Sequence, residues 1–255
     1  MIQALCLVQG VHQVAENIFV LRFVSSTISR TSRAGQFVNI RTGDGYEPLL
    51  RRPFSVYRTE GDDVEIIFNV VGRGTAALSR KHTGDRIDVL GPLGVPFTLD
   101  ADDFATAVLI GGGLGVAPLP IATSALRTLG KPILTLLGSR SSTQLVESHL
   151  ENLRVATDDG TRGYEGNVVA LAAKILSDST YKKPKLFACG PIPMLRSVAD
   201  LARRRDLPCE VSLEGAMGCG FGICQGCPVE LIDSDKKYAL MCKDGPAFDI
   251  RRIRI

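Results

Sequence analysis

Four cysteines near the C-terminus carry the most specific chemistry in this sequence. Cys219, Cys224, Cys227 and Cys242 follow the spacing C-x4-C-x2-C-x14-C. A [2Fe–2S] cluster needs four thiolates around two irons, and three closely spaced cysteines followed by a distant fourth are typical of plant-type ferredoxins. Structural zinc sites usually combine two C-x2-C knuckles, and this segment has one. The spacing therefore favours a [2Fe–2S] cluster over zinc or unligated thiols.

Glycines recur through residues 218–227, which include the first three of these cysteines. A loop that encloses a cluster must turn tightly, reach positive φ and aim backbone N–H groups at the sulfurs, and glycine permits all three. The other three cysteines, Cys6, Cys189 and Cys209, lie among apolar or strand-like neighbours. We therefore assign ligation to the four clustered cysteines.

Two segments have the composition of a dinucleotide-binding edge. Residues 110–118 (IGGGLGVAP) follow an apolar strand-like run and precede a helix-like run. A helix N-terminus at a glycine-rich turn attracts a pyrophosphate, although Pro118 replaces the third glycine of G-x-G-x-x-G and a plain tight turn stays open. Residues 189–191 (Cys-Gly-Pro) also join a strand to a helix, at the sheet edge where ligands bind. The alternative for Cys189 is a small buried side chain.

Two earlier segments are candidates for phosphate or ring contacts. In Arg52-Pro53-Phe54-Ser55 the cation and the hydroxyl are three positions apart on an expected strand. They face opposite sides, so they could touch different parts of a long ligand but not one small anion. Gly72-Arg73-Gly74-Thr75 ends a strand and begins a helix, which makes it a second phosphate cradle. An ordinary barrel strand and turn remain open for both.

Two kinds of scaffold would position these residues. The first hundred residues contain short alternating strands bounded by Gly, Pro and Asp, which predict an antiparallel barrel or sandwich. From about residue 103, strands alternate with helices, which predicts a doubly wound parallel sheet. Residues 214–255 are too few to form a stable core without a cross-link such as a bound metal. The expected strands are 36–40, 64–71, 87–89, 105–110, 133–137, 154–157 and 185–188, and the expected helices begin near 74 and cover 119–129, 167–175 and 191–204.

Composition excludes several classes of function. The net charge of +3 is too small to indicate nucleic acid or an anionic membrane, and the absence of Trp disfavours base stacking. No stretch approaches the ~20 apolar residues that span a bilayer, so we expect a cytoplasmic protein, where structural disulfides are rare. His12, His82 and His149 are isolated. We therefore assign no catalytic residue for substrate chemistry.

These motifs, in this order, resemble the ferredoxin–NAD(P) reductase superfamily over essentially the whole chain. The resemblance implies that Arg52 meets a flavin phosphate, that Ser55 lies near the flavin ring and that residues 74–75 hold the pyrophosphate. Residues 67–69 would line the flavin, and Met194 would lie with residues 189–191 beside the nicotinamide. The implied cofactor-binding residues are Arg52, Pro53, Phe54, Ser55, Ile67, Phe68, Asn69, Gly74, Thr75, Gly113, Gly115, Pro118, Cys189, Gly190 and Pro191, and the metal ligands are Cys219, Cys224, Cys227 and Cys242.

Within the superfamily, the chain most resembles the electron-transfer subunits of class 1B dihydroorotate dehydrogenase, which end in a short cluster module. The segments that carry the resemblance are LLRRPFS (49–55), VVGRGT (70–75), TDDG (157–160), SLE (212–214) and CKDGP (242–246). Residues 215–217 depart from it, because we expect a more polar pair before Met217. The resemblance implies an FAD-binding β-barrel in 1–101, an NAD-binding α/β domain in 102–211 and a [2Fe–2S] module in 212–255.

The same resemblance implies an oxidoreductase subunit of pyrimidine biosynthesis. A catalytic partner would oxidise dihydroorotate at its own FMN, and electrons would pass through the [2Fe–2S] cluster and FAD to NAD⁺, in a heterotetramer of two subunits of each kind. A flavin must stand between cluster and NAD, because the cluster carries one electron and nicotinamide accepts a hydride. Arg140, after the second strand of the sheet, could pair a 2′-phosphate, but no second basic residue follows closely. The choices of FAD and NAD come from the resemblance.

Three alternatives remain open at this point. The first is a reductase subunit of another complex, such as a hydrogenase, a ferredoxin:NADP transhydrogenase or an oxygenase. The second is a redox sensor that carries flavin and cluster without being an enzyme, although a sensor would not need the nicotinamide elements. The third is an interaction module that binds only a metal, which zinc without iron would support.

Overall fold

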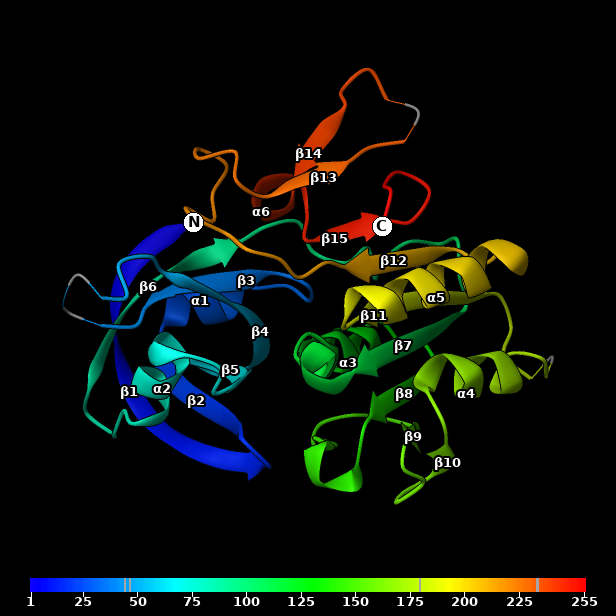
Figure 1. The fold of residues 1–255 in the computed structure, drawn as a ribbon, viewed down its shortest axis with the longest axis horizontal. Helices are drawn as coiled ribbons and strands as arrows, with labels where there is room; N and C mark the ends of the chain where they lie inside the picture. The colour runs from blue at the N-terminus through cyan, green and yellow to red at the C-terminus, as the bar shows by residue number, and fades with distance from the viewer. Residues whose placement is uncertain (44, 46, 179, 233) are drawn as a thin grey trace.

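The computed structural model, which describes residues 1–43, 45, 47–178, 180–232 and 234–255, contains a closed antiparallel barrel, a seven-stranded sheet with helices on both faces, and a small C-terminal lobe (Figure 1). The barrel and the sheet lie side by side, and the lobe lies over their junction. This arrangement confirms the two-part β and α/β architecture expected from the sequence. It also places segments 52–55 and 72–75 in the barrel, segments 110–118 and 189–191 in the sheet, and the four clustered cysteines in the lobe.

The barrel closes in the order β1-β2-β5-β4-β3-β6. Alternate residues of its strands fill the interior, among them Phe23, Ile40 and Phe68, which are almost completely buried. Strand β5 is buried on both faces, unlike the alternating strand expected over 64–71. On its outer face Ile67 joins the apolar core that includes α3, and Glu65 pairs with Arg22. The barrel elements are β1 (Ile2–Ala15), β2 (Ile18–Val24), α1 (Ser26–Thr31), β3 (Phe37–Arg41), β4 (Arg52–Glu60), β5 (Asp63–Asn69), α2 (Arg73–Ser79) and β6 (Arg86–Leu93).

The sheet runs β10-β9-β8-β7-β11-β12-β15, and all its pairs are parallel except the last. Strand β7 is buried along its whole length, as expected for a central parallel strand. Helix α3 packs with the barrel core on one face, and α4 and α5 cover the other. The elements are β7 (Thr106–Gly112), η1 (Gly113–Val116), α3 (Leu119–Thr128), β8 (Ile133–Ser139), η2 (Ser142–Gln144), β9 (Leu153–Thr157), β10 (Tyr164–Glu165), α4 (Val168–Ile175), β11 (Pro184–Cys189), α5 (Ile192–Arg204) and β12 (Cys209–Ser212).

The C-terminal lobe leaves the sheet after β12 and returns to it. Hairpin strands β13 (Pro228–Glu230) and β14 (Tyr238–Leu240) precede the short helix α6 (Met241–Asp244). Strand β15 (Ala247–Asp249) then pairs antiparallel with β12, with Ala247 opposite Ser212. The lobe is therefore attached to the sheet at both of its ends.

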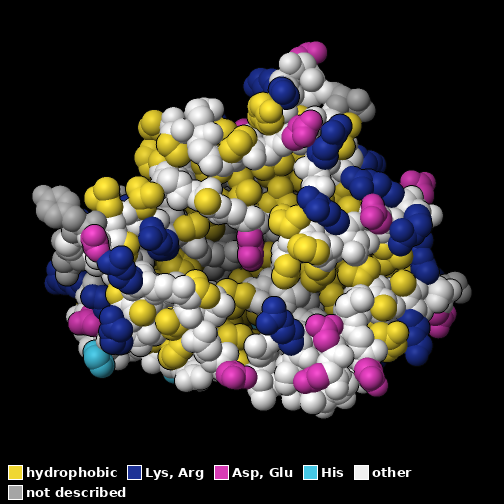
Figure 2. All heavy atoms as spheres, in the orientation of Figure 1, with side chains coloured by type: hydrophobic (Ala, Val, Ile, Leu, Met, Phe, Trp, Pro, Cys, Tyr) yellow, Lys and Arg dark blue, Asp and Glu magenta, His cyan; other side chains and the backbone are white. Residues whose placement is uncertain are grey.

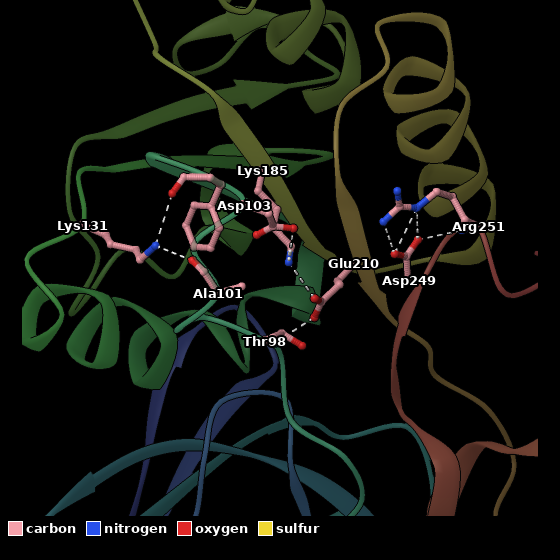
Figure 3. Close-up of polar contacts among 9 residues, drawn as sticks. Thr98, Ala101, Asp103, Lys131, Lys185, Glu210, Asp249 and Arg251 are labelled. Carbon is pink, nitrogen blue, oxygen red and sulfur yellow. Dashed lines mark hydrogen bonds and ion pairs between the residues drawn. The ribbon is translucent and has the colours of Figure 1, made fainter.

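A buried ion pair fastens the linker between barrel and sheet (Figure 3). Lys185 Nζ on β11 lies 3.0 Å from Glu210 Oε1 on β12, and the second carboxylate oxygen of Glu210 accepts a hydrogen bond from Thr98 N at 2.9 Å. The centroid of the Phe104 ring lies 3.8 Å from Lys131 Nζ and 5.5 Å from Lys185 Nζ. A buried charge must be paired. These contacts therefore hold residues 94–105, the linker between β6 and β7, in one position on the sheet.

Among the described residues, no helix combines the length and the apolar character needed to cross a membrane.

Candidate functional site

The four clustered cysteines stand as two pairs in the C-terminal lobe. Cys227 Sγ lies 3.3 Å from Cys242 Sγ, which α6 carries in its first turn. The backbone N–H of Cys224 points at Cys219 Sγ, with an N···S distance of 3.4 Å. The structure contains no set of three or more Cys, His, Asp or Glu side chains placed for one metal ion within its described residues. Two thiol pairs suit the two irons of a [2Fe–2S] cluster, each of which takes two thiolates.

Backbone N–H groups prepare the first sulfur for a metal. Burial raises the pKa of Cys219, but hydrogen bonds from the N–H groups of Cys224, Phe221 and Ile223 outweigh burial and bring this pKa down to about 6. Cys242 differs, because burial and the neighbouring Cys227 raise its pKa to about 12. Iron binding requires thiolates and would displace the proton from that second pair. The donor set therefore fits a cluster, with one pair better prepared than the other.

A pocket of about 240 Å³ lies where the barrel carries its phosphate candidates, and Glu47, Pro48, Arg52, Arg73 and Gly74 line it. A Cβ on Gly74 would stand 3.0 Å from Thr42 Oγ1 and 3.5 Å from Arg52 Cγ, so a larger residue would crowd the pocket wall. Arg51 pairs with Asp88 at 2.6 Å, whereas Arg52 lines the pocket and donates from Nη1 to the backbone carbonyl of Leu50 at 2.8 Å.

Thr42 adds a polar atom that the sequence did not single out. Its side chain is 1% exposed, and Oγ1 has no hydrogen-bond partner in the part of the chain that the structure describes. A buried hydroxyl without a partner is costly. Thr42 borders a neighbouring pocket beside Arg41 and Gly43, rather than the pocket that Arg52 and Gly74 line. The hydroxyl of Thr75, by contrast, is used within its own turn, where it accepts from Val71 N at 3.0 Å. The cations of Arg52 and Arg73 and the close backbone at Gly74 fit the pocket that they line to the phosphate part of a flavin dinucleotide.

The remaining flavin candidates divide between ligand-facing and core positions. Phe54 and Phe68 pack edge to face in the barrel core, with ring centroids 5.7 Å apart, so a ligand would reach them through backbone atoms. Ile67 is buried, whereas Asn69 and Ser55 are half-buried. Pro53 and Ser55 share the outer face of β4, since they are two positions apart.

The dinucleotide candidates meet at the carboxyl ends of β7 and β11, which are adjacent parallel strands. A Cβ on Gly115 would lie 2.0 Å from Cys189 O, and one on Gly112 would lie 2.4 Å from Met194 Sδ. Glycines therefore let the two loops touch. Gly190 has φ of +151°, which suits the turn into α5. The structure brings Gly113, Gly115, Pro118, Cys189, Gly190 and Pro191 to one edge of the sheet.

A pocket of about 270 Å³ opens at this edge between β7, β8 and α5. Arg140 and Asp158 both line it, so the cation noted from the sequence faces the same space as a carboxylate. The position of the pocket matches the general rule that open parallel sheets bind ligands at the carboxyl ends of their strands. Its residues are Gly112, Gly113, Gly138, Ser139, Arg140, Gln144, Asp158, Asn167, Val168, Pro191 and Met194.

Cys189 and Glu214 meet between the carboxyl edge of the sheet and the C-terminal lobe. Cys189 Sγ lies 3.8 Å from Glu214 Oε1, and burial raises the pKa of each group. Glu214 is reached by solvent, but protein surrounds it on several sides. Figure 2 shows the surface of the molecule in the orientation of Figure 1. This surface is hollowed near its centre, with hydrophobic side chains around the hollow and an acidic side chain at its edge.

Comparisons with known proteins agree with this geometry. Residues 214–254 match the family model described as the iron-sulfur cluster binding domain of dihydroorotate dehydrogenase B. The dihydroorotate dehydrogenase B (NAD(+)) electron transfer subunit of Geobacillus thermodenitrificans is 36% identical, over 92% of each chain. The subunit of the same name from Desulforamulus reducens is 35% identical, over 94% of each chain.

Solved structures are similar over most of this chain. The NADH-dependent reduced ferredoxin-NADP oxidoreductase structure, described for flavin-based electron bifurcation, has a TM-score of 0.85 and 31% identity, covering 98% of this chain and 90% of that chain. A ferredoxin reductase in carbazole 1,9a-dioxygenase shares the fold, with a TM-score of 0.65 and 19% identity over 81% of this chain and 67% of that chain.

Proposed function

The chain belongs to the family of dihydroorotate dehydrogenase B (NAD(+)) electron transfer subunits, and from this membership we propose how its residues divide the work. It is an oxidoreductase subunit that uses FAD, a [2Fe–2S] cluster and NAD. The observation that carries this conclusion is the cysteine-rich lobe, which matches the family's cluster domain within a chain similar to the relatives over nearly its whole length. When bound, the cluster carries single electrons, the flavin one or two, and the nicotinamide a hydride.

We propose that Cys219, Cys224, Cys227 and Cys242 hold the cluster. The N–H groups directed at Cys219 Sγ would stabilise negative charge on that sulfur. The arrangement in two pairs supports two irons rather than one metal ion.

The barrel residues hold the flavin in this proposal. Arg52 supplies the cation and Gly74 the close backbone approach for the phosphates, and the side chain of Thr42 packs against Gly74. Pro53 and Ser55 lie on the outer face of β4, where they would contact the flavin ring. Phe54, Ile67, Phe68, Asn69 and Thr75 shape the same wall and turn.

The sheet edge holds NAD in this proposal. Gly113, where an added Cβ would meet nothing within 4 Å, leaves the backbone of η1 open to the dinucleotide, and Gly115 lets η1 pack against the Cys189 loop. Cys189 and Met194 border the nicotinamide end. The carboxylate of Asp158 would accept a ribose 2′-hydroxyl and repel a 2′-phosphate, which favours NAD over NADP despite Arg140. Pro118 and Pro191 begin the helices behind the two loops.

An electron transfer subunit works with a catalytic subunit, and this chain has such a partner. We propose further that the partner contains FMN, that the complex holds two subunits of each kind, and that it works in the cytoplasm. We also propose the division into a flavin barrel in 1–101, an NAD domain in 102–211 and a cluster module in 212–255. The position of the cluster lobe beside the barrel supports passage of electrons from partner to flavin.

The test is dihydroorotate-dependent NADH formation by the complex that co-purifies anaerobically with this chain. We expect activity that disappears when the partner is removed and returns when it is added back. A complex that oxidises no dihydroorotate, while NADH still reduces the flavin and the cluster, would contradict the assignment of the electron donor.

A second candidate is a subunit of an electron-bifurcating transhydrogenase, which the similarity to the ferredoxin-NADP oxidoreductase structure favours. The same purified complex would then reduce NADP⁺ with NADH and reduced ferredoxin together, and would show no dihydroorotate activity. Assaying both reactions on one preparation separates the two candidates.

A further inference from the structure

Asn39 is a buried amide in the middle of β3 that joins the barrel to the cluster loop. It is 0% exposed, and Nδ2 donates a hydrogen bond to the backbone carbonyl of Cys219 at 2.9 Å. Its Oδ1 is buried and has no hydrogen-bond partner in the portion of the chain that the structure covers. An amide with one unsatisfied end is costly in a core, and an apolar residue of similar volume would avoid that cost. The packing of the barrel alone therefore does not explain an amide here.

The register of the barrel places Asn39 on the face that carries the proposed ring contacts. Asn39 lies directly opposite Pro53 in the antiparallel β3–β4 pair, so the two side chains point to the same side. Ser55 shares that side with Pro53 because it is two positions along the strand. Val38 and Ile40 point the other way, into the barrel core. Asn39 therefore stands on the outer wall between the proposed flavin site and the cluster loop.

The cluster loop is shaped to receive this side chain. Gly220 has φ of +82°, and a Cβ at this position would lie 2.0 Å from Asn39 Nδ2. Only glycine lets the backbone come this close and keep that conformation. The hydrogen bond joins residues 180 positions apart, between a barrel strand and the first cluster cysteine.

We propose that Asn39 is a positioning residue, which fixes the Cys219 end of the cluster loop against the outer barrel wall and so sets the rate at which electrons pass between cluster and flavin. This inference rests on the proposed function. In that function, two electrons arrive singly through the cluster and, with one proton from solvent, leave as the hydride that converts NAD⁺ to NADH. Electron passage falls steeply with separation, so a loop held in one position passes electrons faster than one that moves.

The test uses the full-length protein with flavin and cluster, in four forms. These are the unaltered chain, Asn39→Ala, Gly220→Ala and the matched control Gln36→Ala. Gln36 also donates an amide hydrogen bond to a distant backbone carbonyl, that of Gly94 at 2.8 Å, but does not contact the cluster loop in any interaction the structure records. Each protein is mixed rapidly with NADH under anaerobic conditions. Flavin reduction is followed by absorbance and cluster reduction by freeze-quench EPR.

We expect Asn39→Ala to slow cluster reduction about tenfold relative to flavin reduction, since a tenfold change corresponds to about 1.4 kcal/mol, the scale of one hydrogen bond to a buried carbonyl. The EPR g values of the reduced cluster should shift, because the loop that bears Cys219 loses its support. Gly220→Ala should change both quantities in the same direction. Gln36→Ala should change neither.

Three results would overturn the proposal. The first is an Asn39→Ala protein whose rate ratio and EPR spectrum equal those of the unaltered chain. The second is an equal effect from Gln36→Ala, which would mean general loosening of the barrel. The third is loss of the cluster from Asn39→Ala with full loading of Gln36→Ala, which would make Asn39 an assembly residue. Failure of NADH to reduce flavin or cluster in the unaltered chain would instead contradict the proposed function.

Discussion

Replacing Gly115 with alanine tests whether the loops at the sheet edge hold NAD. In the structure a Cβ at this position would meet Cys189 O at 2.0 Å, Cys189 C at 2.4 Å and Gly190 Cα at 2.7 Å. All three are backbone atoms, so no side chain can rotate away. An ordinary carbon–oxygen contact is about 3.3 Å, so the two loops would have to separate by roughly 1.3 Å.

A displacement of this size has a large expected effect on hydride transfer. Misplacement of reacting groups by about 1 Å can cost on the order of 100-fold in rate. We therefore expect Gly115→Ala to lower NADH-dependent flavin reduction by about 100-fold, while flavin and iron contents stay normal. The assay is NADH:dye reduction with rate and KM measured separately, because the displacement should affect both binding and transfer.

Gly10→Ala is the matched control. Its added Cβ would meet nothing closer than Thr83 Oγ1 at 4.0 Å, on the barrel. It should behave like the unaltered chain. A Gly115→Ala protein with unchanged rate and KM for NADH would refute the placement of the nicotinamide at this edge.

Three other variants probe the cluster, the nucleotide preference and a buried carboxyl. Cys224→Ala should abolish the [2Fe–2S] EPR signal and leave most NADH:dye activity, and a normal rhombic signal would contradict the ligand assignment. Asp158→Ser should lower the KM for NADPH about tenfold, the effect of about 1.4 kcal/mol, and raise the KM for NADH, whose 2′-hydroxyl loses its carboxylate acceptor; equal changes in the same direction for both would exclude a role at the 2′ position. Burial raises the pKa of Glu214 above 4.5, so ionising it on folding costs stability as pH rises through that value. Glu214→Gln should therefore raise the thermal unfolding temperature at pH 7, by a small amount because solvent reaches the carboxyl. This gain should vanish below pH 4.5, and a gain that persists below pH 4.5 would contradict the account.

Local patterns were enough to predict much of the fold. The alternation of strand and helix signals after residue 103 predicted the parallel sheet, because each βαβ unit is encoded in adjacent residues. The short helix expected near residue 74 is α2, and the expected strand at 185–188 falls within β11. Strand β1 was not predicted, since polar and apolar residues mix along its length and its pairing with β6 joins distant segments.

The residues that the sequence did not reveal act through long-range contacts. Asn39 and Thr42 belong to no sequence motif. They were identified because each has a buried polar atom without a hydrogen-bond partner, which can be recognised only in the tertiary structure. The three-residue strand β15 gives almost no pattern signal, yet it completes the sheet beside β12. The four cysteines were recognised from spacing because the chemistry of the cluster imposes that spacing locally. Their pairing became visible only in the structure.

Because β15 pairs with β12, the cluster lobe is an insertion whose first and last residues lie next to each other on the sheet. Because Ser212 and Ala247 face each other in an antiparallel pair, a two-residue Asn-Gly turn could join them in place of everything between. The shortened chain would keep both strands and the barrel. It should fold as a cluster-free flavin reductase that oxidises NADH with dyes but cannot exchange electrons with a protein partner. The cluster lobe would then be a module that can be deleted without loss of the flavin reductase. A shortened chain that fails to bind flavin would show that the lobe also stabilises the barrel.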